Sequence, residues 1–186
     1  MSIGTIMTKL KLSMAGLAIL AGFAAVWSIG LEPDPARAAR LEATPTGDVL
    51  LRVSGKINAT NVGDEAHFDL DMLKKMPATT FKTSTIWTEG VNSFTGVSLE
   101  DLLAAVEAQG KTLRATAIND YAVQLPVSDA TSPGPMVAYE MNGKPMSRRG
   151  KGPLWIIYPF DQNSRFQSET IYSRSIWQLD RIEVID

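Results

Sequence analysis

The sequence contains no cysteine and a single histidine, His67. Without thiols the chain can form no disulfide, no cysteine-ligated zinc site and no cysteine nucleophile. One histidine cannot supply the several imidazole ligands of a zinc or iron site, so we interpret His67 as a surface or strand-edge side chain. No serine lies in a nucleophile-elbow motif, so a serine hydrolase is disfavoured as well.

The sequence also lacks a basic excess and a nucleotide-binding glycine motif. The formal net charge is −2 for the whole chain, and it becomes −3 for residues 39–186 because the first 38 residues hold three positive and two negative charges. Nucleic-acid binders usually carry clustered positive charge, so we predict no nucleic-acid partner. Neither GxGxxG nor GxxxxGK[ST] occurs, which argues against dinucleotide and P-loop sites.

The N-terminal segment has the pattern of an export signal. Two lysines precede an uncharged apolar run over residues 12–31, residues 32–35 break it, and Ala36-Arg37-Ala38 provides small residues before a cleavage site at Ala39. This predicts a signal peptide over residues 1–38 of a bacterial protein and a periplasmic or otherwise extracytoplasmic location. The run is long enough to span a bilayer, so an uncleaved membrane anchor is the alternative. No twin-arginine pair, which marks the export of folded proteins, precedes the run.

Residues 39–186 predict one α+β domain with a mixed β-sheet and short helices. Helices are expected over residues 70–76, capped by Asp69, and over 99–108, capped by Ser98. Asn142-Gly143 predicts a hairpin turn. Strands are expected at 49–55, 79–87, 113–118, 121–127, 136–141, 144–146, 153–158 and 176–185. The continuous apolar run over 153–158 is typical of a central strand.

A cationic loop is the main candidate for binding. Its positive side chains lie among glycines and are Lys144, Arg148, Arg149 and Lys151. Guanidinium groups and backbone N–H groups in such a loop can bind an anion, and a solvated charged turn is the alternative. The carboxylates show no spacing that marks an acid–base pair. Among the aromatic residues, Trp87 and Trp155 are candidates for the wall of a ligand pocket. Core packing is nevertheless the more common role of such side chains, here Trp87, Phe94, Trp155, Tyr158, Phe160, Tyr172 and Trp177.

Four segments in fixed order resemble the molybdopterin-binding domain of sulfite oxidase-type oxidoreductases. They are Phe94–Leu103, then Tyr121–Leu125 together with Val137–Met146, then Gly152–Pro159, and finally Trp177–Val184. The resemblance extends from about Val49 to Val184 and implies that family's fold for residues 39–186. It further implies molybdopterin as a cofactor, with Trp87, Trp155 and the four cations of the loop as the residues closest to it.

The chain differs from the family at the positions that the resemblance assigns to the metal and the cofactor. The resemblance places a metal-ligating cysteine within residues 81–90, where this chain has Phe-Lys-Thr-Ser-Thr-Ile-Trp-Thr-Glu-Gly. The family's histidine and arginine near Gly152–Pro159 are replaced by Gly150 or Lys151 and by Trp155. Two hypotheses follow. One is a non-redox accessory protein that binds an anionic ligand or a periplasmic or membrane protein partner. The other is a molybdopterin oxidoreductase whose metal is held by Thr85, by Glu89 or by no protein ligand.

Overall fold

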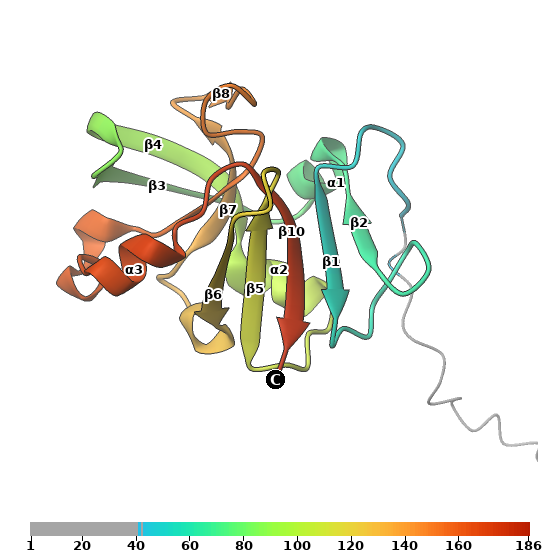
Figure 1. Ribbon diagram of the computed structural model, residues 1–186. Helices are drawn as coiled ribbons and strands as arrows, with labels where there is room; N and C mark the ends of the chain where they lie inside the picture. Colours follow the sequence, from blue (N-terminus) through green and yellow to red (C-terminus); the bar gives the residue numbers. More distant parts are fainter. Residues whose placement is uncertain (1–40, 42) are drawn as a thin grey trace, which may run out of the picture. The chain divides into compact units, whose positions relative to one another are not determined.

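Two five-stranded sheets make up the fold, as Figure 1 shows. The computed structural model describes residue 41 and residues 43–186, so the predicted export segment and the cleavage site before Ala39 lie outside the described residues. Within the described part, no helix is long and apolar enough to cross a bilayer.

The first sheet is mixed. Its strands, in spatial order, are β2 (Ala66–Phe68), β1 (Leu51–Gly55), β10 (Leu179–Ile185), β5 (Thr112–Ala117) and β6 (Ala122–Pro126). β1 and β10 pair in parallel, and the other neighbours are antiparallel. This parallel pair consists of the first and last strands of the domain, so the beginning and the end of the fold are hydrogen-bonded to each other.

The second sheet is antiparallel throughout. Its strands are β3 (Ala78–Thr85), β4 (Thr88–Ser98), β7 (Met136–Met141) and β8 (Lys144–Pro145), with β9 (Trp155–Ile157) also paired to β7. The Asn142-Gly143 turn joins β7 to β8 as predicted, because both residues adopt the positive φ of 53° and 71° that such a turn requires.

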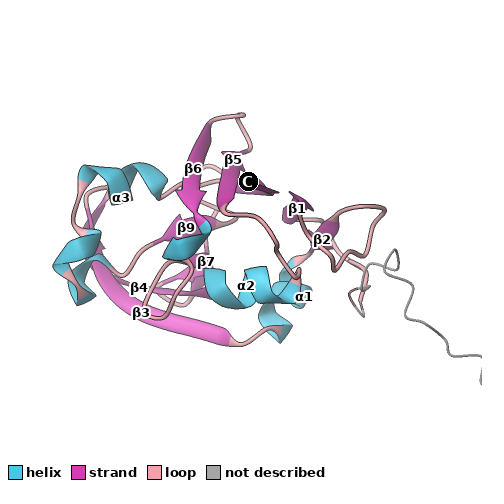
Figure 2. Cartoon of the chain, turned by 90° about the horizontal axis from the view of Figure 1, so that it is seen from below, coloured by secondary structure: helices cyan, strands magenta, loops and turns pink. Residues whose placement is uncertain are grey.

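The helices are short and lie at the ends of the sheets. They are α1 (Leu70–Lys75), α2 (Leu99–Ala105) and α3 (Glu169–Arg174), with 3-10 turns η1 (Val127–Asp129), η2 (Phe160–Gln162) and η3 (Ser164–Phe166). Figure 2 shows α1 and α2 at one end of the β3–β4 hairpin and α3 near its other end. One hydrophobic core takes buried side chains from both sheets and from α2, including Leu99, Leu102 and Leu103. The α+β class is therefore confirmed.

Three expectations about the elements were wrong. β9 has three residues and pairs with β7 on one side, while its other side makes a single bridge from Trp155 to Trp177, so it is not a central strand. Residues 88–98 form an eleven-residue strand that was not expected, because Gly90, Asn92 and Gly96 interrupt any hydrophobic alternation. The second helix ends at Ala105, since Glu107 has a positive φ of 50°.

Both predicted helix caps are confirmed. The Asp69 side chain accepts from the N–H of Met72 at 2.8 Å, and the Ser98 hydroxyl accepts from the N–H of Asp101 at 2.9 Å. Asp69 is buried and also accepts from the N–H groups of Thr46 at 2.8 Å and Gly47 at 2.9 Å. This one carboxylate therefore joins the segment before β1 to the start of α1.

Substitution of Asp69 tests this junction. The N–H groups of Gly47 and Met72 hold the pKa of the Asp69 carboxyl below its usual value. The stabilisation is therefore present above the unfolded pKa of about 4 and is lost as the pH falls through the lower folded pKa. We expect Asp69→Ala to lower the free energy of unfolding by about 2 kcal/mol at pH 7, in urea denaturation, and by less toward pH 2. Asp71→Ala, at an exposed position in the same turn, is the control. An equal loss from both substitutions would contradict this role.

Candidate functional site

The turn between β3 and β4 lies where the resemblance places the metal-ligating cysteine. Hydroxyl pairing holds it together: the Oγ1 atoms of Thr85 and Thr88 lie 2.7 Å apart, and the N–H of Trp87 donates to Thr85 Oγ1 at 3.1 Å. The Asn92 side chain donates to Thr88 Oγ1 at 3.1 Å and to the carbonyl of Glu89 at 3.0 Å. These bonds fix the backbone at the turn and so set the direction of the Trp87 side chain.

Trp87 packs into a cluster of aromatic rings. Its ring centroid lies 5.9 Å from Trp155, 6.1 Å from Phe160, 5.9 Å from Tyr172 and 5.7 Å from Trp177. The contacts with Trp155, Tyr172 and Trp177 have interplanar angles of 64°, 89° and 69°, which is the edge-to-face geometry that aromatic rings favour. The cluster joins the β3–β4 turn to β9, to α3 and to the segment before β10.

Tyr172 is brought to this cluster by a polar contact under α3. Asp129 in η1 accepts from Arg174 Nη1 at 2.8 Å and from the hydroxyl of Tyr158 at 2.7 Å. Burial, followed by the hydrogen bond to Asp129, raises the pKa of the Tyr158 hydroxyl well above its usual value. Tyr158 therefore stays protonated and donates to Asp129, which fixes α3 next to the aromatic cluster.

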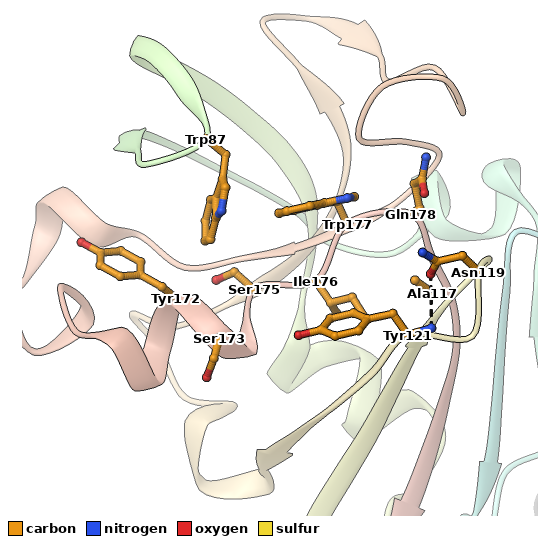
Figure 3. Close-up of a pocket in the computed structure, with 10 residues that line it drawn as sticks. All are labelled: Trp87, Ala117, Asn119, Tyr121, Tyr172, Ser173, Ser175, Ile176, Trp177 and Gln178. Carbon is orange, nitrogen blue, oxygen red and sulfur yellow. Dashed lines mark hydrogen bonds between the residues drawn. The ribbon is translucent and has the colours of Figure 1, made fainter.

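A cavity of about 420 Å³ opens beside the cluster. Figure 3 shows its lining side chains, which come from the β3–β4 turn, the β5–β6 turn, α3 and the segment that leads into β10. They are Trp87, Ala117, Asn119, Tyr121, Tyr172, Ser173, Ser175, Ile176, Trp177 and Gln178. Aromatic rings and neutral polar groups form the wall, and no carboxylate, lysine or arginine is among these residues. We call it the aromatic cavity.

The cationic loop borders a second hollow, of about 560 Å³, and Lys144, Met146, Ser147 and Lys151 are in its wall. Gly152 allows the loop to close tightly, because a Cβ at that position would lie 1.9 Å from the carbonyl oxygen of Met146. Gln178 joins the loop to the aromatic cavity, since its Nε2 donates to the carbonyl of Arg148 at 2.6 Å.

The structure brings some of the six predicted site residues together and separates others. Lys151 lies over Trp177, with Nζ 4.2 Å from the ring centroid, and over Trp155 at 5.2 Å. Burial lowers the pKa of Lys151. Trp155 is fully buried and lines neither hollow. Trp87 lines the aromatic cavity, Lys144 lines the second hollow, and the exposed Arg148 and Arg149 line neither.

The sequence reasoning did not single out Asn119, Tyr121 or Gln178. Asn119 and Gln178 lie on different turns, far apart in the sequence, and meet only in the folded chain (Figure 3). Asn119 was expected in a turn between two strands, and β5 and β6 are indeed joined there. Nothing in the sequence marks these amides as neighbours.

The chain belongs to the oxidoreductase molybdopterin binding domain family, whose model matches residues 46–165. Among solved structures, the sulfane dehydrogenase SoxCD from Paracoccus pantotrophus is similar in fold, with a TM-score of 0.57 and 19% sequence identity. The match covers 78% of this chain and 40% of that chain, so this protein corresponds to less than half of that enzyme subunit. A sequence search finds no match among curated proteins. The resemblance to the sulfite oxidase-type fold is thereby confirmed.

The residues present do not fit the metal of this family's cofactor. A molybdenum centre of this type uses a soft thiolate, and the chain has no cysteine. In the β3–β4 turn the hydroxyls bond to one another, and the carboxylate of Glu89 is exposed. Within the described residues, no group of three His, Cys, Asp or Glu side chains could hold a metal ion. These side chains therefore offer a molybdenum centre of this type no thiolate ligand.

Proposed function

We propose that this protein is a non-redox ligand-binding or accessory protein, located outside the cytoplasm, that uses the molybdopterin-binding fold without the metal. One observation carries the proposal: the β3–β4 turn offers hydroxyls that bond to one another where the family resemblance expects a thiolate, and it directs Trp87 into an aromatic cluster. An aromatic cavity with a few neutral polar groups is the general form of an organic ligand site.

The alternative is a molybdopterin-dependent oxidoreductase with an unusual ligand set. The family match over residues 46–165 favours it. Thr85 and Glu89 are its candidate ligands, yet Thr85 Oγ1 is already bonded to Thr88 and to the N–H of Trp87. To ligate a metal, the Thr85 hydroxyl would have to break both of these hydrogen bonds. We therefore favour the non-redox function.

The cationic loop is the candidate contact for an anionic ligand, or for an acidic region of a periplasmic or membrane partner. Arg148 and Arg149 are exposed, and neither makes a salt bridge among the described residues. Their guanidinium groups are therefore available to an anion. The cationic loop lies next to the aromatic cavity, because Gln178 lines that cavity and its Nε2 donates to the carbonyl of Arg148 in the loop.

A double substitution tests the loop. We expect Arg148→Ala with Arg149→Ala to weaken binding of inorganic phosphate at least about tenfold, measured by calorimetry at low salt, because charge-assisted hydrogen bonds are lost. Lys75→Ala with Lys111→Ala removes the same charge from two exposed positions outside the loop and is the control. If phosphate binds equally well to both double variants, the loop has no part in anion binding.

A further inference from the structure

The outer edge of β3 is open along most of its length. β3 is the outermost strand of its sheet (Figure 2) and pairs with β4 alone, in a regular antiparallel register over residues 78–84. The N–H of Ser84 donates to the Asp161 carboxylate, so Ser84 directs its backbone groups away from β4. Alternate residues of an antiparallel strand direct these groups to the same edge, and the other outward-facing residues are therefore Ala78, Thr80 and Lys82. The backbone N–H and C=O groups of these three residues have no hydrogen-bond partner among the described residues.

The other sheet edges are shorter or closed. At β2, the Asn61 side chain donates to the carbonyl of His67 at 2.8 Å and accepts from its N–H at 2.8 Å, as a neighbouring strand would. β6 has five residues and ends in Pro126, which has no N–H, and β8 has only two residues. Proteins protect their edges in such ways because open backbone groups attract another strand. β3 has eight residues and is the longest edge strand that the structure describes, and no side chain closes it between Ala78 and Lys82.

A hollow of about 420 Å³ lies beside this edge, and we call it the edge hollow. Residues 79–81 of β3 form one wall. Consecutive residues of a strand point to opposite faces of the sheet, so a hollow that all three residues line must lie along the edge. The opposite wall comes from the loop over residues 131–135 and from the start of α2, with Glu100 and Asp101. The open backbone groups of β3 therefore border free space, into which another chain can enter.

The edge hollow is acidic. Glu100 and Asp101 are the only charged side chains in its wall, and neither forms a salt bridge with a described residue. Asp101 Oδ2 accepts from the Ser98 hydroxyl at 2.6 Å, and Glu100 is exposed. The hollow therefore attracts an arginine or lysine side chain from an incoming chain.

A second copy of this protein complements the edge hollow poorly. If two β3 strands paired about a twofold axis, each copy would bring the same hollow to the interface, because a twofold interface uses one surface twice. Glu100 and Asp101 from both copies would then meet, and Lys82 is the only charged side chain that β3 itself supplies to balance them. The charges favour a different chain, with basic side chains, over self-association.

We propose that the open edge of β3 binds an extended, basic segment of a partner protein as an added strand. The segment hydrogen-bonds to the backbone of Ala78, Thr80 and Lys82 and directs arginine or lysine side chains to Glu100 and Asp101. In such an addition the main-chain bonds supply affinity, and the side-chain contacts supply specificity. The surface shares no residue with the aromatic cavity or the cationic loop, so it stands or falls separately from the function proposed above.

Two short peptides test the charge of the partner on the purified full chain. The first is fluorescein-labelled Thr-Arg-Val-Arg-Val-Arg-amide, in which arginine alternates with β-branched residues, and the second has glutamate in place of each arginine. By fluorescence anisotropy we expect the arginine peptide to bind at least about tenfold more tightly than the glutamate peptide. Equal affinity for the two, or no binding of the arginine peptide, overturns the proposal.

Backbone methylation of the arginine peptide tests the strand geometry. One analogue is N-methylated at the three arginines and the other at the three remaining residues, so each loses the N–H groups of one edge. Only one edge of an added strand faces β3. We therefore expect one analogue to bind at least about tenfold more weakly than the parent peptide and the other to stay within about threefold of it. Loss of binding in both analogues, or in neither, overturns the proposal.

A matched pair of variants tests the assigned edge. Thr80→Pro removes an outward N–H and places the proline ring on the open edge, while the bonds between β3 and β4 remain. Thr80→Val loses the hydroxyl, which lies 2.9 Å from Thr95 Oγ1, but keeps the N–H. We expect the proline variant to weaken binding of the arginine peptide at least about tenfold and the valine variant to change it less than about twofold. Equal affinity for the two overturns the assignment. Urea denaturation checks that both variants fold, and the methylated peptides decide the question if Thr80→Pro does not.

A charge-neutralising pair of variants and the oligomeric state complete the test. Glu100→Gln should weaken binding of the arginine peptide about threefold, and Glu107→Gln, which makes the same change at an exposed position outside the edge hollow, should leave it unchanged. Equal affinity for these two variants overturns the role of the hollow. Sedimentation velocity of the full chain should show no dimer that depends on this edge. A dimer that Thr80→Pro converts to monomer would show that a second copy occupies the edge, and would overturn the assignment of a basic partner.

Discussion

Replacing Trp155 with alanine is expected to lower the free energy of unfolding by about 4 kcal/mol. Trp155 is fully buried, and its ring centroid lies 5.4 Å from Phe94, 5.9 Å from Trp87 and 6.2 Å from Trp177. Truncation would leave a large void where β9 meets the aromatic cluster, and the rings around it could collapse only in part. Urea denaturation monitored by far-UV circular dichroism measures the loss.

The variant Trp155→Phe separates the contribution of the ring volume from that of the indole N–H. The indole Nε1 of Trp155 is buried and has no hydrogen-bond partner among the described residues. Phenylalanine keeps most of the ring volume and removes this unsatisfied donor, so the cost should be only about 1–2 kcal/mol. A Phe variant as unstable as the Ala variant would show that the indole N–H makes a stabilising bond, and would contradict the packing described here.

Replacing Gly96 with alanine should destabilise the domain by more than about 3 kcal/mol, or prevent folding, because a backbone clash has no flexible side chain to relieve it. A Cβ at Gly96 would lie 2.1 Å from the carbonyl oxygen of Val137 and 2.5 Å from the Cα of Ala138. Both atoms belong to β7, which pairs with β4 at this point. Soluble yield and urea denaturation measure the effect.

Gly47→Ala is the matched control for Gly96→Ala. A Cβ at Gly47 would approach no atom closer than 3.6 Å, and the backbone there has no positive φ. The N–H that Gly47 donates to Asp69 would be retained. We expect little change in the free energy of unfolding from this substitution. Comparable losses at the two glycines would mean that the close approach of β4 to β7 does not restrict position 96.

Local signals account for the parts of the fold that the sequence predicted. Asp69 and Ser98 cap helices through bonds to residues three positions away, and Asn142-Gly143 closes a two-residue turn, so a short window of sequence contains all the interacting groups. β4 was missed because its pairing with β3 and β7, rather than its own hydrophobic pattern, makes it a strand. The helix that follows it begins after Ser98, as expected.

The candidate site was harder to predict for the same reason. The cationic loop could be seen as a charge cluster, but Lys151 contacts Trp155 and Trp177 rather than solvent alone. Asn119 and Gln178 are ordinary polar residues in the sequence, and only the folded chain brings both into the wall of the aromatic cavity. Long-range pairing decides these positions, and no local pattern encodes it.

Molybdenum and released pterin per protein chain, measured on protein purified from its native host, test the central claim most directly. The account predicts neither in stoichiometric amount, because the chain has no thiolate and the hydroxyls of Thr85 and Thr88 bond to each other. About one molybdenum and one pterin per chain would contradict it. Such a result would establish an oxidoreductase whose metal is held without cysteine.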